Sequence, residues 1–175
     1  MAGLYLFIDN SNLFIEAQRV ARESYYYDDP LVMRMRISYG GLLEAIRSGR
    51  NLSEAVLVGS RPPQNDGLWD KLRQLSISPR IFERNYSNRE KSVDAELTNA
   101  VRDTLEDADE KGVIALVAGD RDYIPVLERC VKKGWPVEVY FWGQASNAIQ
   151  RMDGVEFISL DDYFEQVTFL AKKRD

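Results

Sequence analysis

Four aspartates in this sequence stand where strands should end or helices should begin, and they are the residues best suited to chemistry. They are Asp9 in LYLFIDNSN, Asp94 in EKSVDAELTNA, and Asp120 and Asp122 in VIALVAGDRDYIPVLE. The chain contains no histidine, so it is poorly equipped for Ser-His or His-His chemistry. Carboxylate oxygens instead suit hard divalent cations such as Mg²⁺ and Mn²⁺. The sequence therefore predicts a metal site built from aspartates.

The composition limits the other possibilities. The chain has 175 residues, 45% hydrophobic and 29% charged, which predicts one α/β domain over residues 1–175. The single cysteine, Cys130, keeps helical spacing with Val126 and Leu127, so we expect it in the core. We find no signal-peptide pattern and no apolar run long enough for a membrane helix, so we expect a cytoplasmic protein without a membrane partner. A net charge of −5 disfavours general polyanion binding but leaves local contacts with phosphates open.

Apolar runs and helical periodicities alternate along the chain. Strands are predicted at 4–8, 54–58, 79–82, 113–118, 137–141 and 156–158, and helices at 13–22, 38–48, 67–75, 93–108, 123–133, 146–152 and 161–171. The segment 23–30 is predicted to be a loop, Gly134 to end a helix, and Asn10, Ser11 or Asn12 to cap the first helix. This alternation is typical of a three-layer, doubly wound α/β fold with a mostly parallel sheet. By analogy we expect the strand order 3-2-1-4-5, with the sixth strand at an edge.

This topology brings the four aspartates to one pocket. Asp9 ends the first strand and Asp120 ends the fourth, and neighbouring strands lie about 4.8 Å apart. Asp122 starts the next helix, and Asp94 is expected to open the helix before the fourth strand, so both face the same edge of the sheet. Each aspartate alone also fits a helix cap or a first-turn acid, and this alternative stays open, above all for Asp94 and Asp122. Converging carboxylates, however, raise one another's pKa unless a cation neutralises them, which favours a metal site.

Four segments, in order and at similar spacing, resemble the NYN family of PIN-like nuclease domains and its LabA-like group. LFIDNSNLF resembles the opening strand and D-x-x-N segment, and KSVDAELTNAV resembles the K-G-V-D helix start. ALVAGDRDYIPVLERCVKKGWPVEVYFW resembles the S-G-D-x-D-F segment with its helix and strand, and ASNAIQRMDGVEFISLDD resembles the tail. The resemblance implies a PIN-like fold and metal-dependent hydrolysis of RNA phosphodiester bonds, with Mg²⁺ or Mn²⁺ as the cofactor.

The resemblance also implies roles for single residues. Asp9 and Asp120 would hold the principal ion, while Asp94 and Asp122 would hold a second ion or orient the attacking water. Asn12 would support the metal site or contact a phosphate, Lys91 would contact a phosphate near the site entrance, and Ser146 would lie at the opposite rim as a further substrate contact.

The sequence departs from the family pattern near these acids. Ala118 stands where the family often has Ser, and Arg121 stands where a small residue is usual. Ala100 replaces a further Asp that many members carry, and Asn99 lies beside it but one step off that face of the helix. These changes put in doubt the support around the acids rather than the acids themselves.

Cations and aromatic residues near these segments are the candidate contacts for single-stranded RNA. The arginines are Arg61, Arg84, Arg89 and Arg121, and the residues able to stack on unpaired bases are Tyr86 and Tyr25–Tyr27. A solvated arginine or a tyrosine that covers a core edge is the simpler interpretation of each one. The aromatic run 137–143 (VEVYFWG) is expected in the core or at a homodimer contact.

Other functions remain open. One alternative keeps the fold without catalysis, as an RNA-binding or regulatory module, although four retained acids argue against it. A HAD-type phosphatase would need an Asp where Ser11 stands, and a receiver domain would need a phospho-acceptor Asp after the third strand, where ERNYSN contains no Asp. The sequence therefore favours a metal-dependent ribonuclease. It does not identify the RNA, the number of ions, or endonuclease against exonuclease activity.

Overall fold

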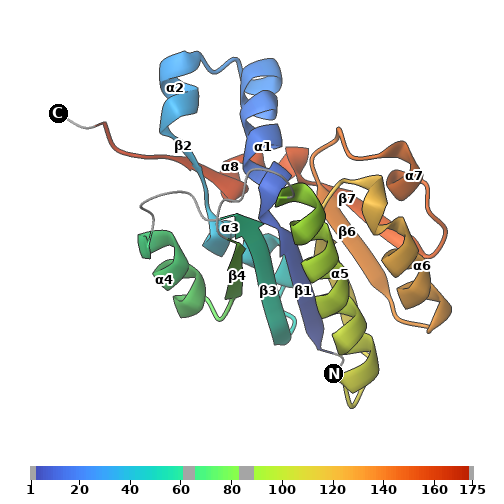
Figure 1. Ribbon diagram of the computed structural model, residues 1–175. Coiled ribbons are helices and arrows are strands. Elements are labelled where there is room, and N and C mark those ends of the chain that lie inside the picture. The colour runs from blue at the N-terminus through green and yellow to red at the C-terminus, as the bar shows by residue number, and fades with distance from the viewer. Residues whose placement is uncertain (1–2, 61–65, 83–88, 174–175) are drawn as a thin grey trace.

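A six-stranded parallel sheet forms the centre of the computed structural model, which describes residues 3–60, 66–82 and 89–173 (Figure 1). The strands lie in the order β4-β3-β1-β5-β6-β7. Their bounds are β1 Leu4–Asp9, β3 Leu52–Ser60, β4 Ser78–Phe82, β5 Val113–Val117, β6 Val137–Phe141 and β7 Val155–Ser159. The predicted α/β class is confirmed. Counted within this sheet alone, the predicted order 3-2-1-4-5 describes the first five strands, and β7 adds a sixth at the β6 edge.

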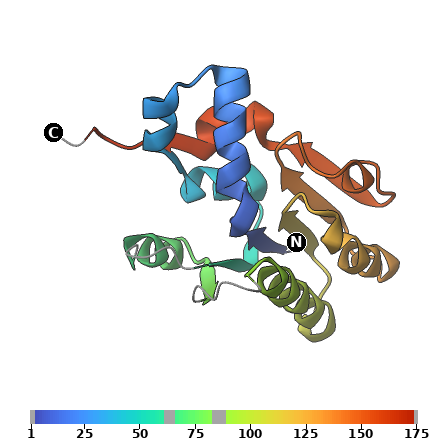
Figure 2. The same cartoon turned by 45° about the horizontal axis from the view of Figure 1, so that its top comes forward.

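Helices cover both faces of the sheet, which is why its central strands are almost continuously apolar. Successive side chains of a strand point to opposite faces, so Leu6 and Ile8 of β1 join one core and Phe7 joins the other. The first core also takes residues of α1 (Asn10–Tyr25), α3 (Tyr39–Arg47), α4 (Asp66–Gln74) and α8 (Phe164–Val167). The second core takes residues of α5 (Arg89–Asp107), α6 (Ile124–Lys132) and α7 (Asn147–Gln150). Figure 2 shows α1 on one side of the sheet and α5 and α6 on the other.

Helix ends agree with the sequence at some positions and correct it at others. α3 lies between Ser38 and Ser48 as predicted, and the Ser38 hydroxyl accepts a hydrogen bond from the Gly41 N–H. The prediction that Asn10, Ser11 or Asn12 caps the first helix is wrong, because Asp9 is the N-cap and accepts from the Ser11 N–H at 2.9 Å. α6 ends just before Gly134, as expected.

The start of α5 is a correction that affects the candidate site. Helix formers at 89–91 extend the helix to Arg89, so Asp94 lies in its second turn and does not open it. This position removes the alternative that Asp94 is a helix cap.

A second, small sheet was not predicted. In it β2 (Met35–Ile37) pairs antiparallel with β8 (Thr168–Leu170). The segment 161–171, predicted as one helix, instead contains most of the short turn η2 (Leu160–Tyr163), then α8 and β8. The segment 23–30, predicted as a loop, contains the end of α1 and the start of α2 (Asp29–Arg34). Three-residue strands are too short to show a period, and their partners lie more than 130 residues apart.

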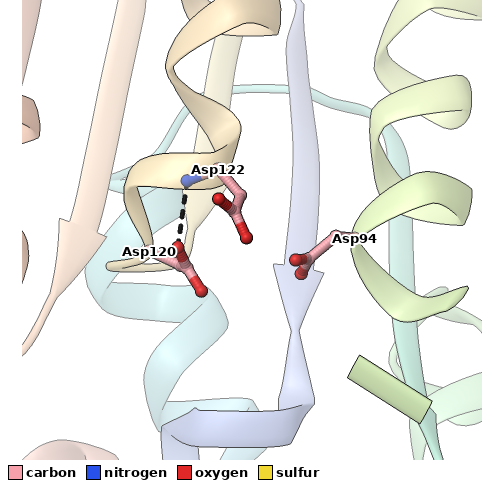
Figure 3. Close-up of side chains that lie close together, drawn as sticks. All are labelled: Asp94, Asp120 and Asp122. Atoms are coloured by element: carbon pink, nitrogen blue, oxygen red, sulfur yellow. Dashed lines mark hydrogen bonds between the residues drawn. The ribbon is translucent and has the colours of Figure 1, made fainter. Parts of the chain in front are cut away.

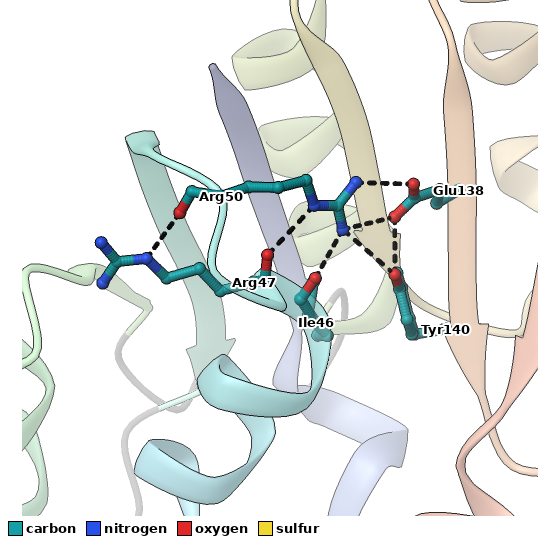
Figure 4. Close-up of polar contacts among 5 residues, drawn as sticks. All are labelled: Ile46, Arg47, Arg50, Glu138 and Tyr140. Carbon is teal, nitrogen blue, oxygen red and sulfur yellow. Dashed lines mark hydrogen bonds and ion pairs between the residues drawn. The ribbon is translucent and has the colours of Figure 1, made fainter. Parts of the chain in front are cut away.

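An ion-pair network near the amino ends of the strands connects the end of α3 with β6 (Figure 4). The Arg50 guanidinium donates to both carboxylate oxygens of Glu138, at 2.7 and 2.9 Å. It also donates to the carbonyls of Ile46 and Arg47, and the Tyr140 hydroxyl donates to Glu138 at 2.6 Å. Burial alone would raise the pKa of Glu138, but the hydrogen bonds from Arg50 and Tyr140 lower it. The network is therefore well satisfied and fixes the end of α3 against the sheet.

Other sequence expectations concern the core. Cys130 is fully buried, and burial raises the pKa of its thiol to about 12, so it is a core residue rather than a nucleophile. The aromatic run on β6 is also buried, and the Trp142 indole donates to the Leu13 carbonyl. The aromatic side chains of that run therefore belong to the core. Within the described ranges, no helix is both long and apolar enough to cross a bilayer.

Candidate metal-binding active site

The candidate site lies at the carboxyl ends of β1 and β5. These two strands are parallel neighbours, with Ile8 paired to Val117. After β1 the chain enters α1 on one face of the sheet, and after β5 it enters the turn η1 (Arg121–Tyr123) and α6 on the other face. A crevice opens where the chain diverges in this way, and ligands of open α/β sheets bind in such crevices.

Three carboxylates meet in this crevice. Asp94 projects from α5, while Asp120 and Asp122 come from the turn after β5, and all three point into the space beside the end of β1 (Figure 3). One oxygen of each lies within 4.8 Å of the others. Hard cations bind oxygens at roughly 2.0–2.6 Å, so oxygens up to about twice that distance apart can share one ion. The donor set therefore fits Mg²⁺ or Mn²⁺.

The turn after β5 holds Asp120 and Asp122 in fixed relation. Asp120 is the N-cap of η1, and its Oδ1 accepts from the Asp122 N–H at 2.9 Å (Figure 3). Gly119 precedes it, and a Cβ at that position would lie 2.3 Å from the Phe141 ring. Only glycine therefore lets the backbone pass so close to β6. Capping and ligand roles are compatible here, because the second oxygen of Asp120 stays available.

Asp9 is held differently from the other three acids. It is 4% exposed, its Oδ1 accepts from the Ser11 N–H, and its Oδ2 accepts from the Tyr123 hydroxyl at 2.6 Å. Among the residues that the structure describes, the group of ligand atoms comprises Asp94, Asp120 and Asp122 and does not include Asp9. Asp9 thus lies at the floor of the site, with both oxygens already engaged by the protein.

The electrostatics of the site show an unneutralised cluster. Burial first, and then the neighbouring Asp9, Asp120 and Asp122, raise the pKa of Asp94 from 3.8 to about 6, while the Tyr123 hydroxyl beside it opposes the shift. Burial, with Asp9 and Asp94 close by, also raises the pKa of Tyr123, so this residue stays a neutral donor. A cation among these acids would remove the repulsion between them. The charge of the site therefore fits a divalent ion.

The predicted substrate contacts have mixed outcomes. Arg121 is exposed in η1 between two site acids, and the Ser146 N–H donates to the Gly119 carbonyl, which places Ser146 beside the site. Asn12 lies in the first turn of α1, and Arg89 and Lys91 lie in the first turn of α5, but their side chains are outside the described part of the structure. Three further candidates fall outside the described residues altogether, namely Arg61, Arg84 and Tyr86.

The tyrosine run divides between core and surface. Tyr25 stacks on Phe164 with ring centroids 4.1 Å apart, and Tyr27 packs edge-on against the same ring. Tyr26 is 86% exposed and follows the end of α1. The simpler interpretation is therefore correct for Tyr25 and Tyr27, which cover the edge of the core.

The structure also identifies residues that the sequence analysis missed. Tyr123 links Asp9 to the acidic cluster through its hydroxyl. In the sequence, the one sign of this role is that Tyr stands where the family motif has Phe. A shallow groove of about 380 Å³ runs from Asp94 and Asp122 along α5 past Thr98, Asn99 and Arg102. Helical spacing from Asp94 could have placed Thr98 and Arg102 on this face. Asn99, noted beside Ala100, lines the groove as well.

The fold and the acidic crevice define a doubly wound α/β domain of the PIN-like nuclease type. The family model described as NYN domain matches residues 3–161, nearly the whole chain, and the chain therefore belongs to the NYN family. Members of this family are generally nucleases. No curated protein matches the chain significantly.

Proposed function

We propose that the protein is a metal-dependent ribonuclease that hydrolyses phosphodiester bonds of single-stranded RNA. The observation that carries the proposal is the meeting of Asp94, Asp120 and Asp122 at the switch point of an NYN-family sheet. The rest of α5 and all of β5 lie between Asp94 and Asp120 in the sequence, so the meeting of these acids is a property of the fold. A cluster in which the Asp94 pKa is raised and no described cation neutralises the acids is suited to a divalent cation.

The residues would divide the work as follows. Asp94, Asp120 and Asp122 would hold Mg²⁺ or Mn²⁺, and Asp9 would orient Tyr123 and keep the floor of the site negative. The bound ion would supply charge neutralisation at the phosphate and activation of a water molecule. Arg121, exposed between two acids, would contact a phosphate oxygen by a charge-assisted hydrogen bond. The Ser146 side chain, which makes no cap hydrogen bond, would contribute a further donor at the rim.

The direct test is cleavage of labelled oligonucleotides by the purified protein. Single-stranded RNA and DNA of the same sequence are incubated with Mg²⁺, Mn²⁺ or EDTA, beside Asp94→Asn and Asp120→Asn. Asp153→Asn is the matched control, because this exposed acid lies outside the site. We expect RNA cleavage that needs the metal, is unchanged in the control, and falls at least 100-fold in the two site variants.

Two results would contradict the proposal. Cleavage that persists in EDTA, or that is equal in the site variants, would show that the acids are not the catalytic centre. RNA binding without any cleavage would instead support the alternative, an RNA-binding or regulatory module of the same fold.

A further inference from the structure

We propose that a second groove, next to the acids, binds unpaired nucleotides of the RNA strand on one side of the cleaved phosphate. The inference rests on the proposed function. The groove has a volume of about 760 Å³ and lies between α1, the β2–β8 sheet and the first turns of α3 and α4. We call it the nucleotide groove.

The charge of the nucleotide groove is opposite to that of the chain. Its described lining includes two cations, Arg36 and Lys71, and no acidic residue, although the whole chain carries a net charge of −5. Arg36 donates from one guanidinium nitrogen to the carbonyls of Met33 and Met35, which fixes the side chain at the edge of β2. Lys71 is exposed on α4. A groove of this charge complements a polyanionic backbone, and two cations do so without sequence preference.

The walls of the nucleotide groove are apolar and partly exposed. Phe169 on β8 is 48% exposed and Met33 is 76% exposed, while Phe14 of α1 is half-buried opposite them. Large apolar side chains that stay in water beside cations are typical of sites where bases stack. A folded duplex would bury its bases in its own stack, so this surface suits an unpaired strand.

Asn10 connects the nucleotide groove to the acids. It follows Asp9 directly, yet the two side chains have different partners: Asp9 bonds to Tyr123, and Asn10 accepts from the Tyr39 hydroxyl at 2.6 Å. Tyr39 is buried, and a Cβ at Gly59 would lie 3.2 Å from the Asn10 Cβ, so Asn10 is held firmly from two sides. With its oxygen engaged, Asn10 retains its amide N–H donors for a phosphate or a base carbonyl.

This arrangement defines a path for the RNA strand through the site. Asp9, at the floor of the acidic site, and Asn10, which lines the nucleotide groove, are consecutive residues, so their Cα atoms lie about 3.8 Å apart. A phosphate at the acids would place the neighbouring nucleotide at Asn10 and its base against Phe14 or Phe169. The arrangement therefore predicts that binding needs an unpaired nucleotide next to the cleaved bond.

The inference can be tested by RNA binding in an Asp120→Asn background, which prevents turnover. Binding of a labelled single-stranded RNA is measured for Phe169→Ser and Lys71→Glu. The matched controls are Leu170→Ser, an exposed neighbour on the same strand that does not line the groove, and Lys132→Glu on α6. We expect about 10-fold weaker binding for each groove variant, and less than twofold change for the controls. Circular dichroism verifies that all four variants are folded.

A second measurement locates the strand. RNA with one photoreactive 4-thiouridine is crosslinked to the wild-type chain, and the expected adducts lie on peptides that contain Phe14, Met33 or Phe169. Equal binding by groove and control variants, or adducts confined to other peptides, would overturn the inference. A groove variant that changes sedimentation but not RNA binding would overturn it as well, in favour of a second copy of the chain as the occupant.

The outcomes separate this inference from the proposed function. Groove-dependent RNA binding without cleavage by the wild type would keep the groove and reject the nuclease. Metal-dependent cleavage that is indifferent to the groove variants would keep the nuclease and reject the groove. Absence of RNA binding by the wild type would reject both.

Discussion

Asp94 carries the clearest sign that the site is built for a cation. Its pKa is raised from 3.8 to about 6, first by burial and then by three like charges. Because the folded state binds this proton more tightly than the unfolded state, folding stability falls as pH rises from about 4 through about 6. We predict that Asp94→Asn stabilises the metal-free protein at pH 8 by about 1 kcal/mol, a value reduced because solvent screens a half-exposed carboxylate.

The measurement is urea unfolding in EDTA at pH 8 and at pH 4. At pH 4 the wild-type Asp94 is already protonated, so the advantage of the variant should nearly vanish. Asp153→Asn should show no comparable gain at either pH. A destabilised Asp94→Asn protein at pH 8 would indicate that Asp94 makes a favourable contact which outweighs the repulsion.

Tyr123 is a positioning residue whose hydroxyl can be removed without disturbing its ring. We predict that Tyr123→Phe lowers cleavage about 10-fold, because Asp9 loses a buried hydrogen bond of 2.6 Å and the floor of the site loosens. The nearby Tyr123 hydroxyl also lowers the Asp94 pKa, so removal of this hydroxyl should move the acid limb of the pH–rate profile to higher pH. A variant with a reduced rate but an unmoved limb would show that the hydroxyl only supports packing. The same substitution also tests whether the Phe of the family motif supports cleavage as well as Tyr123 does in this chain.

At the scale of elements, the Arg50–Glu138 pair tests whether the amino end of the sheet supports the site. We predict that Arg50→Leu destabilises the protein by roughly 1–2 kcal/mol, since among the described residues it leaves the partly buried Glu138 with the Tyr140 hydroxyl as its remaining hydrogen-bond partner. The folded-state pKa of Glu138 is lowered from 4.5, so this stability is present above that value and is lost as pH falls through the lowered one.

Thermal unfolding at pH 7 and pH 3 measures the effect. The control is Arg129→Leu, whose partner Glu106 is 3.9 Å away with both side chains about half exposed, and which should cost less than about 0.5 kcal/mol. A loss for Arg50→Leu that is as large at pH 3 as at pH 7 would mean that packing, rather than charge, explains it.

The elements also show where the sequence could and could not predict the structure. β1 and β5 were predictable because buried parallel strands are continuous apolar runs, and α3 was predictable from its serine at each end. The β2–β8 sheet was not, because each strand has three residues and pairs with a distant partner. The predicted helix began at residue 93, whereas α5 begins at Arg89, because the first turn of α5 is polar and shows no apolar period.

The same distinction holds at the site. The positions of Asp120 and Asp122 followed from the strand before them, and the predicted topology correctly brought Asp94 near them. The environment of Asp9 was not predictable, because its partner Tyr123 lies 114 residues away and hydroxyl contacts leave no periodic signal. The capping alternative also failed to distinguish metal-binding acids from purely structural ones. Asp9 and Asp120 are the two caps, whereas Asp94 and Asp122 accept no cap hydrogen bond.

For the whole molecule, repulsion among the site acids lowers the stability of the folded state, and a bound cation would restore that stability. The sheet brings together acids from β1, α5 and the turn after β5, and the described partners leave their repulsion uncompensated. An ion that binds only the folded chain stabilises it by about 3 kcal/mol at 100 times its dissociation constant. We predict that such a concentration of Mg²⁺ or Mn²⁺ raises the melting temperature at pH 8 by about 5 °C or more, given about 2–4 °C per kcal/mol for a chain of this size.

Differential scanning fluorimetry with EDTA, Mg²⁺, Mn²⁺ and Na⁺ at matched ionic strength tests this prediction. The gain should be absent in Asp120→Asn, retained in Asp153→Asn, and much smaller at pH 5, where Asp94 is mostly protonated. If Na⁺ at equal ionic strength gives the same gain, general screening of a −5 chain explains it and the acids hold no specific ion. A gain that survives in Asp120→Asn would place the ion elsewhere on the molecule. The pH dependence also distinguishes a specific ion from general screening, because only a site that includes Asp94 should lose its ion between pH 8 and pH 5.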